Sequence, residues 1–293
     1  MDSYDIVFIG EMSTAKIVPF LGPSFILEHG PVSFSAVAAS CLGKRIAAVT
    51  KISEGKERLL EPLKAKGIEV IARPGEVGEL LVKLPSANLD ERQVFVVKIG
   101  DSLGIDDIPS SEPCLAHLCF FGPRSTQLDL MRALMTRGFR LSVDMQGFVL
   151  QPDMKTGEVH PEDVPEKKEI LTLADYVKLD AMEAQTLTGT DDLRHQADIL
   201  ENWGSSETVI TCAEGALAHR KGTTTFFKFT NSSIPGRMGR GDTVIGSYLA
   251  RRLDHSVEDS LRFAVALTSI KLETAGPFKG NAEEVLAKMQ QVE

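Results

Sequence analysis

Along the chain, short runs of β-branched and aromatic residues alternate with longer stretches in which apolar residues recur every three or four positions. The short runs predict buried strands, at residues 5–9, 45–50, 68–72, 94–99, 114–121, 139–143, 176–179 and 208–211. The longer stretches predict amphipathic helices, at residues 33–42, 56–66, 126–137, 181–187, 193–203, 243–253, 257–274 and 282–292. This alternation is typical of an α/β domain, in which helices connect parallel strands and cover both faces of the sheet.

Three intervals depart from this alternation. Residues 17–28 and 74–99 are extended and interrupted by Gly and Pro, with strand-like runs at 79–84 and 94–98 and no helix to cover a face. We expect them to form a small β-sheet over one edge of the main domain. Residues 145–168 are rich in Pro, Gly and charged side chains, which predicts a long surface excursion.

Composition narrows the class of protein. The chain has 293 residues, 43% of them apolar and 25% charged, which is enough for one large domain or two smaller ones. Its 32 basic and 41 acidic side chains give a net charge of −9, so we expect no nucleic-acid or membrane partner. No apolar run reaches the roughly 18–20 residues of a membrane span, and acids stand near the N-terminus where a secretory signal has bases. The four cysteines form no C-x-x-C pair, which favours buried free thiols and predicts a cytoplasmic protein.

A glycine-rich loop is the most distinctive local feature. Residues 235–243 read PGRMGRGDT and precede a predicted helix. Such a loop can point several backbone N–H groups at one place, where the helix dipole adds partial positive charge, and we expect Gly241 to need a positive φ there. An anion such as a phosphate suits this place. The alternative is an ordinary helix start that Asp242 caps.

The residues of this loop also suit phosphoryl transfer. Asp242 could take the proton from a hydroxyl that attacks a phosphoryl group, while the N–H groups, Arg240 and a metal ion stabilise charge. The loop is not a Walker A loop, because no G-K-[ST] follows its glycines, and no G-x-G-x-x-G follows the first strand. The missing glycine pattern argues against an NAD-dependent dehydrogenase.

Five motifs in order resemble the ribokinase-like (PfkB) carbohydrate kinase family. The loop resembles the family's G-A-G-D-T signature, with Arg240 in place of Ala. Residues 29–43 resemble its G-G-P segment, and residues 178–183, which read KLDAME, resemble its N-x-x-E motif. Residues 211–216 resemble its nucleotide loop, and residues 263–277 resemble its last long helix and the turn after it. The resemblance covers nearly the whole chain.

The resemblance implies a fold and a reaction. The implied fold is one ribokinase-like domain over residues 1–293, with three layers, a central mostly parallel sheet and a small β-sheet lid made by segments near 15–30 and 73–100. The implied reaction transfers the γ-phosphate of ATP, with Mg²⁺, to a hydroxyl of a small molecule. In it, Asp242 is the general base, and the backbone N–H groups of Gly239, Arg240 and Gly241 form an anion hole.

The resemblance also implies the binding residues. On the nucleotide side these are Thr211, Glu214, Gly215, Val265, Asp180 and Glu183. The last two would act on magnesium through water, since Mg²⁺ prefers oxygen ligands. On the acceptor side they are Thr14, His29, Gly30 and Phe34. From the residues alone, a helix cap at Asp180 and a core strand end at Thr211 stay open as alternatives.

Departures from the family pattern bear mostly on the acceptor. Ala15 stands where the family has an Asp that holds sugar hydroxyls, and Phe34 replaces an Asn. His29 replaces the first Gly of the G-G-P segment. Gly236 and Met238 replace an Asp and a Thr of the catalytic loop, which weakens the usual monovalent-cation site.

The sequence therefore predicts an ATP-dependent kinase whose acceptor is a carbohydrate-like molecule such as a sugar, a sugar acid or inositol. A nucleoside kinase is the alternative that Phe34 favours, because its ring offers a stacking surface. A catalytically idle ligand-binding or regulatory protein is the alternative that the changes at Ala15, Phe34 and Gly236 favour. A homodimer through the lid is a further expectation, because an exposed sheet edge needs a partner or a cover.

Overall fold

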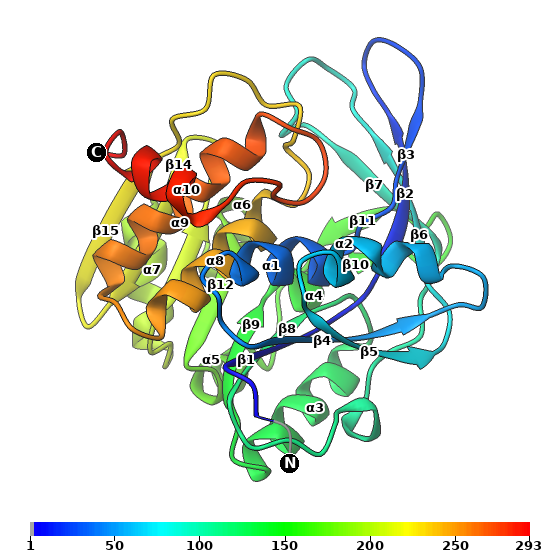
Figure 1. Ribbon diagram of the computed structural model, residues 1–293, viewed down its shortest axis with the longest axis horizontal. Coiled ribbons are helices and arrows are strands. Elements are labelled where there is room, and N and C mark those ends of the chain that lie inside the picture. The colour runs from blue at the N-terminus through cyan, green and yellow to red at the C-terminus, as the bar shows by residue number, and fades with distance from the viewer. Residues whose placement is uncertain (1–2) are drawn as a thin grey trace.

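The computed structural model, which describes residues 3–293, has a large α/β core with a small sheet above one side (Figure 1). The central sheet has nine strands in the order β15-β14-β13-β12-β9-β8-β1-β4-β5. Pairing is parallel from β13 to β5, whereas β14 pairs antiparallel with both β13 and β15, so among the described strands of this sheet β14 alone runs opposite to the others. The strands are β1 (Ile6–Gly10), β4 (Ile46–Ile52), β5 (Glu69–Pro74), β8 (Leu115–Cys119), β9 (Arg140–Asp144), β12 (Tyr176–Asp180), β13 (Thr208–Thr211), β14 (Gly215–Arg220) and β15 (Thr223–Lys228).

Helices cover both faces of this sheet, as Figure 1 shows. One layer holds α1 (Pro31–Ser40), η1 (Glu57–Leu60), α2 (Glu61–Lys64), α8 (Arg240–Arg252), α9 (Val257–Leu272) and α10 (Ala282–Met289). The other holds η2 (Ile105–Asp107), α3 (Arg124–Thr136), α5 (Lys167–Leu173), α6 (Ala181–Thr188) and α7 (Leu193–Asn202). Strand β1 is apolar throughout because Ile6 and Phe8 pack into the first layer, while Val7 and Ile9 pack into the second. No helix within residues 3–293 is long and apolar enough to cross a bilayer.

The lid is a separate four-stranded sheet in the order β3-β2-β6-β7. Its strands are β2 (Ser13–Val18), β3 (Phe25–Leu27), β6 (Gly78–Lys83) and β7 (Gln93–Lys98). A small core of Ala15, Ile17 and Val82 holds its inner face together. The expected α/β class, with a mostly parallel central sheet and a small lid sheet, is confirmed.

Residues 145–168 differ from the expected surface excursion. They form α4 (Gln146–Val149) and a hairpin of β10 (Leu150–Pro152) and β11 (Val159–Pro161). The apolar side chains of Met145, Phe148 and Val149 are fully buried. Gly157 and the charged residues that suggested a loop lie in the hairpin turn and after β11, while Gly147 lies in α4, so the segment divides into a buried part and an exposed part.

Candidate active site

A pocket lies between the carboxyl ends of the central strands and the inner face of the lid. The main domain contributes Glu11 after β1, Asp180 at the end of β12 and Thr211 at the end of β13. The lid contributes Ala15 from β2 and Leu80 from β6, and the loop that starts α8 closes one side. The carboxyl edge of a parallel sheet is where α/β proteins bind ligands.

The loop that starts α8 turns at Gly239, which has φ +76°. A Cβ on Gly239 would lie 2.3 Å from the Phe34 ring, so this position has neither the conformation nor the space for a side chain. The expectation of a positive φ at Gly241 is wrong, because only Gly239 of this loop has one. A Cβ on Gly241 would lie 2.8 Å from the Lys178 ammonium, which is the far end of a flexible side chain.

The N–H groups of the first turn of α8 have no intrahelical acceptors. The Arg240 N–H donates to the Arg237 carbonyl at 3.3 Å, so it is less free than the anion-hole prediction requires. Gly241 and Asp242 occupy the next positions of the turn and line the pocket. The helix dipole therefore places positive potential where these residues lie.

Asp242 is partly buried, and its Oδ1, which is fully buried, accepts no hydrogen bond from the described residues. Burial, with Asp144 as a second cause, raises the pKa of Asp242 to about 7, although Lys178 and Lys271 pull it down. Oδ1 is therefore a vacant acceptor at the helix N-terminus. Such a group can take a proton from a hydroxyl held beside it.

Two lysines supply positive charge around this carboxylate. The Lys178 ammonium lies 3.1 Å from Asp144 and 3.9 Å from Glu183, and these acids outweigh burial and hold the pKa of Lys178 above its usual range. Lys271 donates to the carbonyls of Gly236 and Met238. Burial lowers the pKa of Lys271 to about 7, which Asp242 opposes.

On the acceptor side, His29 and Phe34 line the pocket with their rings edge to face at 5.7 Å. Burial lowers the pKa of His29, and its Nδ1 is buried without a partner. The prediction for Thr14 is not met by the geometry. Side chains alternate along β2, so Ser13 and Ala15 line the pocket and Thr14 does not. Gly30 allows α1 to pack against the backbone that follows β1.

On the donor side, the pocket wall contains Asp180, Thr211 and Glu214. Gly215 instead begins β14, where a Cβ would lie 2.1 Å from the Phe227 carbonyl oxygen. Val265 is fully buried in the layer of α8 and α9, so an adenine contact there has no open surface. Sequence position alone did not show which face of α9 meets the core.

Asp180 caps α6, which was the alternative that the sequence left open. Its Oδ1 accepts from the Glu183 N–H at 2.8 Å, and the Glu183 Oε2 accepts from the Asp180 N–H at 2.7 Å. Glu183 is fully buried and lines no pocket wall of the described residues. Within residues 3–293, no group of three His, Cys, Asp or Glu side chains could hold a metal. Asp180 fits a magnesium ion held mostly by donor phosphates and water, and Glu183 does not.

Several site residues were missed by the sequence analysis. They are Glu11, Asp144, Lys178, Arg237 and Lys271. Glu11 lines the same pocket as Ala15, so a carboxyl group lies near the place where Ala15 lacks one, and burial raises the pKa of Glu11 to about 8. A signal existed for two of them: Asp144 and Lys178 are charged residues within apolar strand runs, near strand ends that meet at the pocket edge.

Comparisons with known proteins agree with this geometry. Residues 158–283 match the pattern of the pfkB family carbohydrate kinases. A cytidine kinase from Thermococcus kodakarensis is 26% identical over 258 residues, which are 84% of this chain and 87% of that protein. A solved pyrophosphate-dependent kinase in the ribokinase family, complexed with a pyrophosphate analogue and myo-inositol, has a TM-score of 0.87 and 28% identity, over 96% of this chain and 99% of its own. Arabidopsis thaliana ribokinase, complexed with ribose and ATP, has a TM-score of 0.72 and 16% identity over 99% of both chains, which supports the fold alone.

The family pattern covers the part of the chain that holds α8 and its glycine loop, and the structural match extends over nearly all the rest. The family and the reaction type expected from the sequence are both confirmed. The chain belongs to the ribokinase-like PfkB carbohydrate kinases, and it is a phosphotransferase with an alcohol group as acceptor.

Proposed function

We propose that this enzyme transfers the terminal phosphoryl group of a polyphosphate donor to a hydroxyl of a cyclic polyol such as an inositol. The observation that carries the proposal is the Oδ1 of Asp242, a buried oxygen without a partner at the N-terminus of α8. An acceptor with hydroxyl groups is favoured, because Glu11 and Asp242 bring to this end of the pocket two carboxyl groups that can form hydrogen bonds with hydroxyls. The related kinase that binds myo-inositol spans nearly the same length of chain.

In the proposed reaction, Asp242 removes the proton from the attacking hydroxyl as the new O–P bond forms. The bond from phosphorus to the bridging oxygen breaks, and that oxygen keeps the electron pair. The N–H groups at the start of α8, together with Lys178 and Arg240, stabilise charge on the transferred group. Bound magnesium would neutralise donor phosphate charge, and Asp180 is the residue that would hold it through water.

ATP with magnesium is the first candidate donor, since it is the donor implied by the resemblance of the sequence motifs to the PfkB carbohydrate kinase family. Pyrophosphate is the second, and two observations favour it. Val265 offers no open surface for a base, while Arg92, Arg237 and Arg240 line the donor side of the pocket. The related inositol-binding kinase is also pyrophosphate-dependent.

A nucleoside is the second candidate acceptor. The cytidine kinase relative supports it, as does the aromatic ring of Phe34 in the pocket wall. Phe34 is only 3% exposed, however, and it lies under Gly239, so little of its face is free for stacking. We therefore place the polyol first.

The test is a matrix of two donors and several acceptors. Magnesium with ATP or with pyrophosphate is combined with myo-inositol, ribose, cytidine or adenosine, and phosphorylated product is measured by ³¹P NMR. We expect myo-inositol to be phosphorylated, and Asp242→Asn to lower kcat by about 10²–10⁴ because it removes the positioned base. The donor Kd should change little.

Three outcomes would count against the proposal. Turnover of no acceptor above the Asp242→Asn rate, with donor still bound, would favour the idle ligand-binding protein. Preference for cytidine would favour the nucleoside kinase. An equal loss of donor affinity and kcat in Asp242→Asn would make Asp242 a structural helix residue.

We further propose that two copies associate through the lid. Strand β3 is an edge of the lid sheet, and it carries the exposed apolar side chains of Phe25 and Ile26. Phe20 and Leu21, in the turn before β3, are exposed as well. Pairing of two such edges would satisfy their backbone groups and cover this apolar surface.

A further inference from the structure

The lid contacts the catalytic loop through one carboxylate. Asp90 lies in the loop between β6 and β7, and its Oδ1 accepts from the Arg237 Nε at 3.0 Å. The same oxygen lies 3.1 Å from the Arg240 Nη2. Both arginines are more than four-fifths buried, with 12% and 8% of their side chains exposed, and they flank Gly239. A lid residue thus ion-pairs with both arginine side chains of the catalytic loop.

This arginine cluster has more positive than negative charge. Arg92 also lines the pocket beside Arg237 and Arg240, and Asp90 is the one acid that ion-pairs with the last two among residues 3–293. Burial, with Arg92 and Arg240 as further causes, lowers the pKa of Arg237 to about 9. The two paired arginines outweigh burial and lower the pKa of Asp90. A buried group of guanidiniums with one carboxylate is suited to a ligand with more negative charge.

The position of the cluster indicates which part of a ligand it would meet. Arg240 and Asp242 belong to the same first turn of α8, and Arg237 lies one turn of the loop before them. A phosphoryl group that reacts beside Asp242 would have the next phosphate of the donor close to these guanidiniums. A planar guanidinium can bind two phosphate oxygens at once.

Resting on the proposed kinase function, we propose that Arg237 and Arg240 form a subsite for the leaving phosphate of the donor, and that Asp90 occupies this subsite until a donor binds. The donor phosphate then replaces the Asp90 carboxylate and releases the lid loop of residues 84–92. The subsite recognises a phosphate and no base, so inorganic pyrophosphate binds there as well as a nucleotide does. Asp90 is therefore a positioning residue for the lid and a competitor of the donor.

The test measures binding of magnesium pyrophosphate by titration calorimetry, without acceptor. Removing the competing charge in Asp90→Asn should tighten binding about tenfold or more, because the donor no longer has to displace a carboxylate that is ion-paired with Arg237 and Arg240. Asp90→Ala should do the same. Arg237→Gln should weaken binding by about tenfold or more. Glu91→Gln is the matched control, since Glu91 bonds only to Ser86 and Asn88 of its own loop among the described contacts, and it should bind like the wild type.

A second measurement follows the loop itself. Glu91 is the site where a glutamate-specific protease would cut the released loop. Pyrophosphate should accelerate cleavage of the wild type, and Asp90→Ala should be cleaved quickly without it. Unchanged or weaker binding by both Asp90 variants, or wild-type binding by a folded Arg237→Gln, would overturn the inference. Neither measurement involves turnover. An inactive protein with the expected changes in pyrophosphate affinity and cleavage would therefore contradict only the proposed function. An active kinase without those changes would contradict only this inference.

Discussion

At the residue scale, the chemistry of Asp242 depends on side chains that are distant in the sequence. Asp144 from β9 and Lys178 from β12 set its charge environment together with Lys271 from α9. The sequence motif identified the carboxylate, and the fold provides the groups that adjust its pKa. A carboxylate that is half ionised near neutral pH suits the general-base role proposed for Asp242, because proton transfer is most efficient there.

The raised pKa of Asp242 predicts a pH dependence. The carboxylate must be ionised to act as a base, so kcat/KM should rise with pH through an apparent pKa near 7, about three units above an ordinary Asp. Asp144→Asn should move this rise in kcat/KM to lower pH, because it removes the like charge that does most to raise the pKa of Asp242. A rise that stays near pH 4 in the wild type, or that does not move in Asp144→Asn, would contradict the assignment.

The same shift predicts a change in stability. The folded pKa is raised above the unfolded value of 3.8, so the contribution of Asp242 to stability is full below about pH 4 and is lost as the pH rises through about 7. Asp242→Asn, which carries no charge to bury, should therefore gain stability relative to the wild type between pH 6 and pH 8. Urea denaturation at both pH values measures this difference, and a constant difference would argue against the raised pKa.

Motif reasoning found the residues that lie directly in the glycine loop and at strand ends. Asp180, Thr211 and Asp242 all line the pocket. It failed for Thr14, because one residue along a strand reverses the side chain, and for Val265, because a helix face could not be assigned from one sequence. No motif identified Asp144, Lys178 or Lys271 as residues whose charge shifts the pKa of Asp242.

At the element scale, the turn that starts α8 depends more on Gly239 than on Gly241. Gly239→Ala should lower both kcat and donor affinity by about tenfold or more, because it combines a positive φ with a clash against Phe34. Gly241→Ala should be milder, since only the end of Lys178 has to move. Kinetics of the two variants beside a thermal unfolding control separate them, and equal damage would show that the turn is not set by Gly239.

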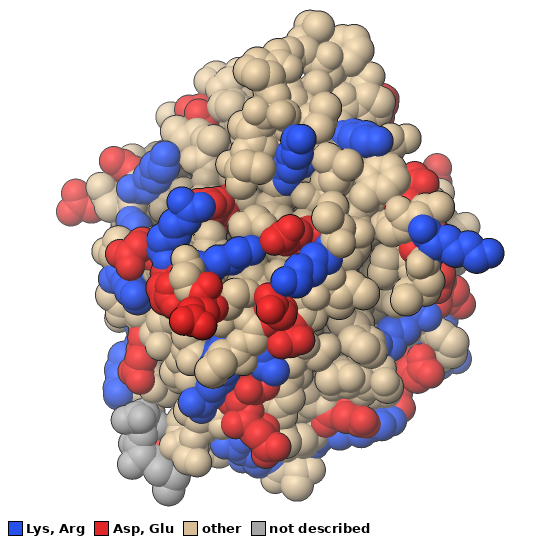
Figure 2. Space-filling view, turned by 90° about the vertical axis from the view of Figure 1, so that its right-hand side faces the viewer, with Lys and Arg blue, Asp and Glu red and all other residues tan. Residues whose placement is uncertain are grey.

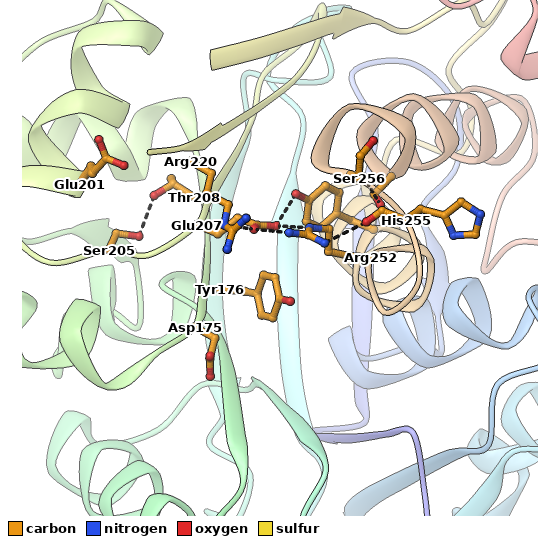
Figure 3. A network of polar contacts seen from close by, with 12 residues as sticks. Asp175, Tyr176, Glu201, Ser205, Glu207, Thr208, Arg220, Arg252, His255 and Ser256 are labelled. Carbon is orange, nitrogen blue, oxygen red and sulfur yellow. Dashed lines mark hydrogen bonds and ion pairs between the residues drawn. The ribbon is translucent and has the colours of Figure 1, made fainter. Parts of the chain in front are cut away.

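A second element-scale feature is the buried carboxylate at the other end of α8. Figure 3 shows Glu207, which precedes β13, between Arg220 and Arg252. Its Oε1 accepts from the Tyr248 hydroxyl at 2.6 Å and from the Arg252 Nε at 3.0 Å, while its Oε2 lies 3.2 Å from the Arg220 Nε. Glu207 is only 3% exposed, whereas its partners Arg220 and Arg252 are 42% and 17% exposed, so this network ties α8 to the central sheet through a buried carboxylate and partly solvated arginines.

Removing this charge should destabilise the fold and spare the site. Glu207→Gln leaves Arg252 without its counter-charge, and we expect a loss of about 1–2 kcal/mol in the free energy of unfolding, because the arginines are partly exposed. The control is Glu258→Gln, which breaks an exposed pair with Arg262 and should cost no more than about 0.5 kcal/mol. Donor affinity should be unchanged in both. Equal urea midpoints for the two variants would contradict the role of the network.

At the scale of the whole molecule, the order of layers was predictable because parallel strands read as continuous apolar runs. The antiparallel edge was not predicted. Strands β14 and β15 mix Thr and His with apolar residues, and they are joined at Lys221 and Gly222, both with positive φ. The hairpin of β10 and β11 was missed for a related reason, since its short strands contain two prolines. Short strands of mixed polarity carry no clear sequence pattern, so they can be recognised only once their pairing with neighbouring strands is known.

The lid is the part of the surface where the whole molecule has most reason to associate. Figure 2 faces the lid side and shows few charged residues at the top, where Figure 1 places the lid loops, and charges of both signs below. Leu21 and Ile26 are 80% and 58% exposed there. An unpaired strand edge beside apolar side chains is a surface that proteins normally cover or protect.

We therefore predict that the wild type sediments as a dimer, at twice its 31.9 kDa, at tens of micromolar. Ile26→Lys should shift it to monomer, because a charge on an edge strand opposes edge pairing. Leu286→Lys, an exposed apolar position on α10 away from the lid, is the control and should stay dimeric. Because lid residues line the pocket proposed for the acceptor, the monomeric variant should show a raised acceptor KM with kcat little changed. A monomeric wild type, or a dimer that Ile26→Lys leaves intact, would assign this apolar surface to something other than a second copy.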